Sequence, residues 1–280
     1  MTLKKLAWTT DLHLNFLDEN GIRAFLQTVI DANPDAVLIG GDITDAPRMI
    51  ATLRLIEQTL QRPIYFVLGN HDYYHGSIRD VRQIVRDMAD ASEHLTYLST
   101  GGVISFGDDP ATATALVGHG GWGDGRLGDY AHSWVTLNDH VLIEELAWKP
   151  KADLLRRLNH LGDEAAAHIR TVLPQAFAHH RRVIVLTHVP PFKEACWHEG
   201  QISDDNFLPH FTCKAVGDAL LNVMDQVMAE QSAASAKKEL LVLCGHTHGA
   251  GEAYIRDTVR VLTGGADYGA PAIQHIFEVC

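Results

Sequence analysis

The sequence has no run of the roughly 18–20 apolar residues that a membrane-spanning helix needs. Cysteine is also scarce, and the four that occur, Cys196, Cys213, Cys244 and Cys280, form no C-x-x-C pair. This spacing argues against a disulfide framework and favours a reducing compartment, so we expect a cytoplasmic protein. The start, MTLKKLAWTT, lacks the apolar core and cleavage site of a secretion signal, and we expect it to belong to the mature protein.

Positive charge is in short supply as well. The chain has 23 Lys and Arg against 35 Asp and Glu, a formal net charge of −12. An acidic surface repels nucleic acid backbones, so the composition disfavours a nucleic acid partner, and we expect no membrane partner. Histidine, by contrast, is abundant, with 17 among 280 residues. The useful question is therefore where the histidines lie.

Short apolar runs alternate with segments of helical spacing, which indicates parallel βαβ units whose strands are covered on both faces. Strands are expected in KLAWTT, AVLIG, IYFVLG, ATALVGHG, RVIVLTH, LLVLCGH, RVLTGG and IQHIFEV. Helices are expected at 19–32, 48–60, 77–90, most of 139–180 with a break at Pro150, and 214–230, and residues 231–239 as a surface connection. We therefore expect one α/β domain over residues 1–280, with two sheet halves.

Polar side chains follow five of these strands at their carboxyl ends, the edge where open α/β sheets bind ligands. They are Asp11 and His13 in TTDLHL, Asp42 and Asp45 in GGDITD, Asn70, His71 and Asp72 in LGNHDYYH, His188 in VLTHVPP, and His246 and His248 in LVLCGHTH. Side chains alternate along a strand, so Asp11 and His13 need a local turn to bind one ion. Aspartate, histidine and asparagine without thiolates suit Mn, Fe or Zn, and this many ligands suit two ions that share a carboxylate.

The ordered motifs D-x-H, G-D-x-x-D, G-N-H-D, H and G-H-x-H resemble the calcineurin-like metallophosphoesterase family over nearly the whole chain. The resemblance implies an αββα sandwich of two mixed sheets flanked by helices, with a dimetal site at the carboxyl edge of the strands. It implies that the first metal is held by Asp11, His13, Asp42 and His248, and the second by Asp42, Asn70, His188 and His246. It further implies that His71 lies beside the metals without binding them and that Asp45 orients His71.

This interpretation predicts a dimetal phosphoester hydrolase that uses two divalent or trivalent ions. When bound, two such ions would polarise a phosphoryl oxygen and lower the pKa of a bridging water, and the resulting hydroxide would attack phosphorus in line. His71 would stabilise the developing charge and protonate the leaving group. Asp45 would hold His71 in the right tautomer.

Plainer interpretations remain open for some of these residues. Asp42 and Asp45 are also suited to capping the next helix, since aspartate is a favoured N-cap. His188 is open to a structural role at its strand end. Asp72 is left out of the ligand set because it can equally brace its loop.

Two loops are ambiguous. The stretch GHGGWGDG, with His119, Trp122 and Asp124, either lines the substrate pocket or forms a surface turn, and His75 is equally undecided. The stretch CWHEG at 196–200 has no recognised metal-ligand spacing, and we expect it to cover the pocket. Residues 139–215 are open to forming a lid or the contact of a homo-oligomer.

The motifs narrow the substrate class by what they lack. Protein phosphatases of the family carry Arg-Gly after G-D-x-x-D, where this chain has Ala46-Pro47, and purple acid phosphatases carry a tyrosine at the place of Asp45. The motifs are more similar to class III cyclic-nucleotide phosphodiesterases and their broad-specificity relatives. We expect a phosphodiesterase or broad phosphatase for small soluble esters, with cyclic nucleotides as one candidate. The alternatives are a phosphoprotein phosphatase, a non-catalytic metal-binding module, a dimetal hydrolase of amides or lactones, and a nuclease.

Overall fold

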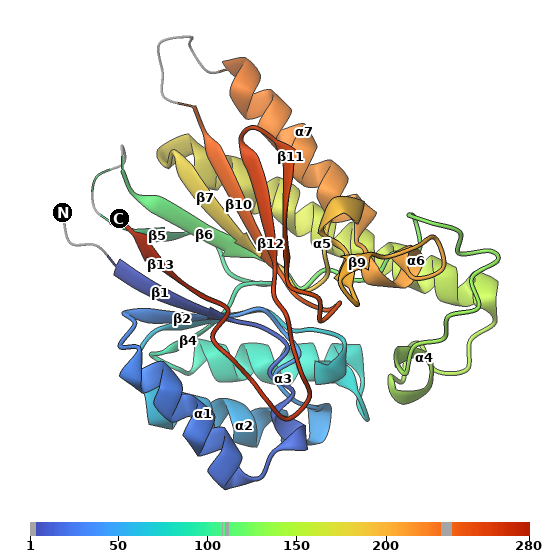
Figure 1. Ribbon diagram of the computed structural model, residues 1–280, viewed down its shortest axis with the longest axis horizontal. Coiled ribbons are helices and arrows are strands. Elements are labelled where there is room, and N and C mark those ends of the chain that lie inside the picture. Colours follow the sequence, from blue (N-terminus) through green and yellow to red (C-terminus); the bar gives the residue numbers. More distant parts are fainter. Residues whose placement is uncertain (1–3, 108, 110–111, 231–236) are drawn as a thin grey trace.

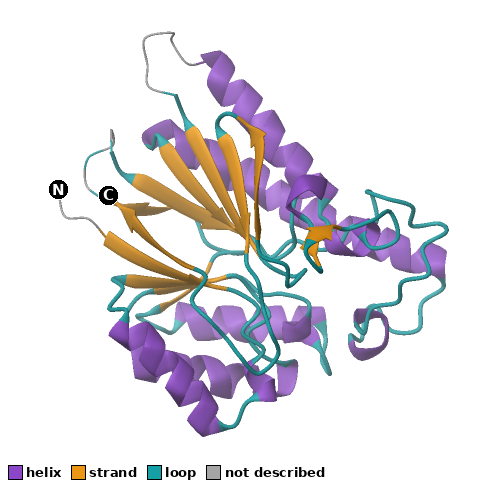
Figure 2. Cartoon of the chain, viewed as in Figure 1, coloured by secondary structure: helices purple, strands orange, loops and turns teal. Residues whose placement is uncertain are grey.

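The computed structural model describes residues 4–107, 109, 112–230 and 237–280, and shows two large sheets packed face to face with helices outside them (Figures 1 and 2). The first sheet has the order β13–β1–β2–β3–β4 and the second β11–β12–β10–β7–β6–β5. Both are mixed, because β13, β11 and β5 run antiparallel to their neighbours while the other pairs are parallel. This arrangement is the predicted αββα sandwich.

Every segment that the sequence predicted as a strand contains one. These strands are β1 (Lys4–Thr9), β2 (Ala36–Ile39), β3 (Ile64–Phe66), β6 (Thr114–Gly118), β7 (Arg182–Leu186), β10 (Glu239–Cys244), β12 (Val259–Thr263) and β13 (His275–Val279). The sequence did not predict β4 (Leu95–Tyr97), β5 (Ile104–Phe106), β11 (Gly251–Arg256) or the hairpin of β8 (Trp197–His198) and β9 (Gln201–Ile202). Of the connection expected at 231–239, residues 231–236 lie outside the described part of the chain.

The long helices cover the two outer faces. Helices α1 (Glu19–Asp31), α2 (Met49–Leu60) and α3 (Ile78–Asp90) pack on the first sheet, and α5 (Lys151–His179) and α7 (Lys214–Glu230) on the second (Figure 2). Short elements complete the chain, namely α4 (Asp139–Leu142), α6 (Leu208–Phe211), η1 (Leu14–Phe16), η2 (Ala46–Arg48), η3 (His71–Tyr73) and η4 (Lys193–Ala195). The predicted break at Pro150 is confirmed, since residues 143–150 are not helical and α5 begins directly after Pro150.

Apolar side chains of both sheets form the layer between them. Leu6 and Leu38 of the first sheet belong to the same buried cluster as Leu116, Ile184 and Leu243 of the second. The cluster keeps the sheets in contact while their parallel strands end at a common edge. The polar loops of both sheets therefore meet there.

Candidate metal centre

The structure brings all seven predicted metal ligands together at this edge. They follow five strands of the two sheets. Asp11 and His13 come after β1, Asp42 after β2, Asn70 after β3, His188 after β7, and His246 and His248 after β10. Five of them have left-handed backbone angles, with φ 51° at Asp11, 44° at His13, 50° at Asp42, 70° at His246 and 59° at His248. Non-glycine residues seldom adopt this conformation, and it is concentrated at functional sites. It supplies the local turn that Asp11 and His13 need to face the same point.

Glycines let the loops approach one another. A methyl group on Gly69 would overlap Asp42 Oδ1, and one on Gly245 would overlap Asp11 Oδ2. Gly41, with φ +94°, would carry its methyl group against the backbone of Gly69. The carboxylates can therefore reach the centre only because these positions lack a side chain.

The first group of ligands is Asp11, His13, Asp42 and His248. Their ligand atoms all lie within 4.8 Å of one another. His13 Nε2 is 3.0 Å from His248 Nε2 and 3.8 Å from Asp42 Oδ2, and His248 Nε2 is 3.6 Å from Asp11 Oδ1. Two ligands that each bind one ion at about 2.1 Å lie roughly 3–4 Å apart, so these separations fit a shared cation.

The second group of ligands is Asn70, His188 and His246. Their lone pairs converge without a proton between them. His188 Nδ1 donates to Gly40 O at 3.0 Å, and His246 Nε2 donates to His210 O at 3.1 Å. The other ring nitrogens, His188 Nε2 and His246 Nδ1, are therefore unprotonated in the neutral imidazoles, and they lie 3.2 Å apart. Asn70 Oδ1 lies 3.1 Å from the first and 2.9 Å from the second. Three lone-pair donors that face one point in this way are suited to a cation.

Asp42 lies between the two groups. Its Oδ2 is on the side of His13, while its Oδ1 is 3.4 Å from His188 Nε2. One carboxylate that offers one oxygen to each group is the arrangement expected of a bridge between two ions. The N-cap interpretation of the aspartates is not supported, because α2 begins after Arg48 and Asp45 makes no side-chain cap hydrogen bond.

Burial shifts the titration of these groups. Burial raises the pKa of Asp11 to about 7, and burial together with the Asp11 carboxylate raises that of Asp42 well above its usual range. Burial lowers the pKa of His13 to about 2 and that of His248 to about 4. The histidines are therefore neutral lone-pair donors at neutral pH, while the carboxylates lack compensating positive charge, which a metal supplies.

His71 lies beside the centre, as the resemblance implied. Its Nε2 is 4.0 Å from Asp42 Oδ2, and its ring stacks on Tyr74 at 4.2 Å between centroids. The implied contact with Asp45 is not formed: Asp45 Oδ2 pairs with Arg48, and Oδ1 has no hydrogen-bond partner among the described residues. Arg48 satisfies the charge of Asp45 locally, three residues along the chain.

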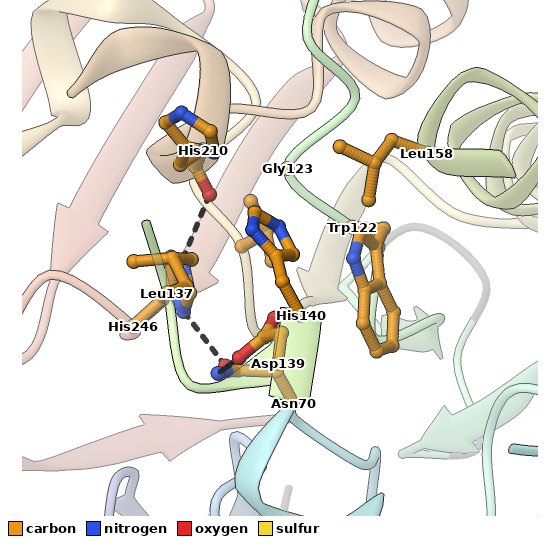
Figure 3. Close-up of a pocket in the computed structure, with 11 residues that line it drawn as sticks. Asn70, Trp122, Gly123, Leu137, Asp139, His140, Leu158, His210 and His246 are labelled. Carbon is orange, nitrogen blue, oxygen red and sulfur yellow. Dashed lines mark hydrogen bonds between the residues drawn. The ribbon is translucent and has the colours of Figure 1, made fainter. Parts of the chain in front are cut away.

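Asp139 is a functional candidate that the sequence did not indicate. Its Oδ1 accepts hydrogen bonds from Asn70 Nδ2 at 2.8 Å and from the Tyr74 hydroxyl at 2.8 Å. This contact turns the amide nitrogen of Asn70 away from the second group and leaves Oδ1 facing it (Figure 3). No motif could have shown this, because Asp139 lies 69 residues from Asn70 in the chain.

Asp72 and Trp122 are both buried beside the ligand loops. Asp72 accepts backbone hydrogen bonds from Ile43, Thr44 and Gly69, so it braces the ligand loops. Trp122 is buried beside a cavity of about 10 Å³ behind the second group, which Figure 3 shows. The other two residues of that loop accept backbone hydrogen bonds: His119 Nδ1 accepts from Gly121 N, and Asp124 accepts from Ala215 N at the start of α7. His75 lies between η3 and α3 and is exposed.

A cleft of about 350 Å³ opens over both groups. Residues from the expected insertion form part of its wall, since His198 and Phe211 line it along with Thr136, Leu137 and Asn138. His198 belongs to the β8–β9 hairpin, so the stretch CWHEG does border the pocket, as predicted. On the other side Tyr268 closes the cleft from the loop between β12 and β13.

Two facing mixed sheets with a cluster of Asp and His at their common edge define a class of metal-dependent hydrolases. A family model described as calcineurin-like phosphoesterase matches residues 4–250, and the chain belongs to this family. Membership of this family supports metal-dependent phosphoester hydrolysis, and the structure contains a cluster of Asp and His residues able to bind metal.

Solved structures share the fold. A phosphopantetheinyl hydrolase from Mycobacterium tuberculosis superposes with a TM-score of 0.64 at 14% identity, over 98% of this chain and 95% of that one. A dimetal phosphatase from Danio rerio gives 0.54 at 14% identity, over 94% of this chain and 87% of that one.

Among curated proteins, a Danio rerio protein described as a transmembrane protein with metallophosphoesterase domain is 29% identical over 99 residues. The match covers 33% of this chain and 22% of that protein. Within the described residues of this chain, no helix has both the length and the apolar character to cross a bilayer.

Proposed function

We propose that Asp11, His13, Asp42 and His248 hold one metal ion, and that Asp42, Asn70, His188 and His246 hold a second. The observation that carries this assignment is the convergence of three lone-pair donors in the second group, with both histidine protons used on backbone carbonyls. Manganese, iron and zinc suit this set of oxygen and nitrogen ligands. When bound, two such ions polarise a phosphoryl oxygen and activate water as a nucleophile.

We propose that His71 acts on the leaving group. Burial lowers the pKa of His71 to about 3, so the imidazole is neutral at neutral pH before substrate binds. His71 lines the cleft and is positioned to donate a ring N–H to the departing ester oxygen. A bound phosphoryl anion favours the imidazolium, and full proton transfer then completes the acid role. Asp45 keeps its proposed role of orienting His71 only if its carboxylate leaves Arg48.

The substrate we propose is a small soluble phosphoester, with diesters favoured and cyclic nucleotides among the candidates. The second motif reads GDITDAP, without the Arg-Gly of protein phosphatases. The cleft of about 350 Å³ is the size of a small-molecule site rather than of a protein interface. We further propose a cytoplasmic enzyme, in which residues 139–215 act as a lid or as the contact of a homo-oligomer.

The test is a comparison of bis(p-nitrophenyl) phosphate with p-nitrophenyl phosphate, assayed with added Mn²⁺. Preferential diester cleavage supports the phosphodiesterase, and cyclic nucleotides and phosphopantetheinyl esters are then tried. Monoester preference keeps the site and changes the substrate. Failure to hydrolyse either ester in protein that does contain metal would contradict the proposal.

A further inference from the structure

Two half-exposed aromatic residues meet beside the cleft: Tyr268 lines it, and Phe16 packs against Tyr268. Phe16 is 56% exposed and Tyr268 is 53% exposed. Phe16 ends η1, just after the first ligand motif, while Tyr268 lies in the loop between β12 and β13, the red loop in Figure 1. Their ring centroids are 4.8 Å apart, so segments about 250 residues apart along the chain meet at this point.

The pair adjoins the first ligand group directly. The ring centroid of Tyr268 is 4.6 Å from that of His13 and 5.1 Å from that of His248. The ring centroids of Phe16 and His13 are 6.2 Å apart. Tyr268 thus has one side on the ligand histidines, and about half of each aromatic side chain stays open to solvent beside the cleft.

We propose that Phe16 and Tyr268 form an aromatic platform that stacks on a planar ring substituent of the phosphoester, so that the enzyme prefers aryl or nucleobase-bearing esters over aliphatic ones. The inference rests on the proposed function, because it requires the phosphoryl group to bind at the metal ligands. A single ester oxygen separates an aryl group from phosphorus, so a phosphoryl group at the first ligand group brings an aryl ring to the position of Tyr268. In a nucleotide the sugar lies between phosphate and base, and Phe16 extends the platform outward to meet the more distant ring.

The energetic reason is the desolvation of exposed aromatic surface. Stacking of a base on an aromatic side chain strengthens binding by about tenfold or more per ring. The rest of the cleft exposes less aromatic surface, since Phe211 is only 9% exposed and Thr136 and Asn138 are polar. The planar group is therefore expected on the side of Phe16 and Tyr268.

The test compares the affinities of phenylphosphonate and methylphosphonate for the metal-loaded enzyme. Affinities are measured by calorimetry and, independently, as inhibition constants against bis(p-nitrophenyl) phosphate. Both ligands present the same phosphonate group to the site, so the ratio of their affinities measures the contribution of the phenyl ring. The wild-type protein is expected to bind phenylphosphonate about tenfold more tightly.

The variants are Phe16→Leu and Tyr268→Leu, with Tyr254→Leu as the matched control. Tyr254 is 68% exposed on β11 and does not line the cleft. We expect both platform variants to lose most of the phenyl preference, measured as the ratio of the two affinities, and the control to keep it.

Three results would overturn the inference. They are equal affinity of the two phosphonates for the wild-type protein, a phenyl preference that survives in both variants, and an equal loss of affinity for both phosphonates, which would mean that the rings only support the histidines. Hydrolysis of the diester without a phenyl preference would overturn this inference alone. Metal-loaded protein that binds neither phosphonate and hydrolyses no ester would overturn the proposed function as well.

Discussion

His71 is the residue whose role is separable from metal binding. It lines the cleft and approaches Asp42, but its ring nitrogens do not belong to either ligand group. His71→Ala is expected to lower kcat by roughly 10²–10⁴-fold, the usual contribution of a general acid, and to leave the metal content unchanged. Elemental mass spectrometry beside steady-state kinetics checks this, and loss of metal from the variant would show that His71 is a ligand.

Asp139 acts on metal binding through Asn70. Without the Asp139 carboxylate, the amide nitrogen of Asn70 keeps only its longer hydrogen bond to the Tyr74 hydroxyl at 3.3 Å, so the amide oxygen is held less firmly toward His188 and His246. Asp139→Ala is expected to weaken the second metal about 10–100-fold, as loss of an orienting partner usually does, with little effect on the first. Mn²⁺ titration by calorimetry measures both.

Tyr74→Phe is the control for this prediction. It removes the hydrogen bond to Asp139 and the longer one, 3.3 Å, that the Tyr74 hydroxyl accepts from Asn70 Nδ2, but leaves the 2.8 Å hydrogen bond from Asn70 to Asp139. Equal loss of metal in both variants would mean that local packing, rather than the orientation of Asn70, sets the affinity.

At the scale of the elements, the turn after β3 determines how closely the loops approach. Gly69→Ala places a methyl group against Asp42 and His188, so we expect a loss of about 1–3 kcal/mol in unfolding free energy and weaker metal binding. Gly102→Ala is the matched control, because a methyl group there meets nothing within 4 Å. Thermal denaturation with and without Mn²⁺ compares them, and equal behaviour of the two variants would contradict the close approach.

Apolar strands and their polar ends were predictable from the sequence, and the tertiary partners of the site were not. The run Val37–Ile39 is continuous and buried, so both the strand and the position of Asp42 beyond it could be predicted. Strand β4 carries the polar Thr96 between its two buried residues, and β11 carries the exposed residues Glu252 and Tyr254, so neither forms a run of apolar residues.

Contacts between distant segments explain the remaining differences. The partner of Asn70 comes from α4, and the ring beside His13 comes from the last loop of the chain. For Asp45 the difference has a local cause. Its carboxylate pairs with Arg48, only three residues away, whereas the family pattern pairs it with His71. Such pairings depend on side-chain geometry, which motif spacing does not contain.

At the scale of the whole molecule, metal affinity is expected to depend on pH. Burial raises the pKa of Asp11 to about 7, so its carboxyl is protonated below that pH in the metal-free protein, and a metal must displace the proton. Mn²⁺ affinity should therefore rise from pH 6 to pH 8, and calorimetry in buffers of different ionisation enthalpy should detect proton release. Affinity that does not change over this range would contradict the assignment of Asp11.

The same shift affects stability. Because the folded pKa of Asp11 lies above the unfolded value of 3.8, its contribution to stability is fully present below pH 3.8 and is lost as pH rises through about 7. Bound metal offsets the cost of burying the ionised Asp11 carboxylate, a cost that is larger at pH 8 than at pH 6. The increase in Tm on adding Mn²⁺ should therefore be larger at pH 8 than at pH 6. Differential scanning calorimetry at both pH values measures it, and a larger increase at pH 6 would contradict the assignment.

The central claim is that two neighbouring metal sites share Asp42. The most direct measurement is metal content per chain, by elemental mass spectrometry, for the wild-type protein, His188→Ala and Asp42→Ala after reconstitution with Mn²⁺. The wild type is expected to hold about two ions, His188→Ala about one, and Asp42→Ala the least, because both groups lose a ligand. A wild-type content of about one ion, or an Asp42→Ala variant that retains as much metal as His188→Ala, would contradict the shared carboxylate.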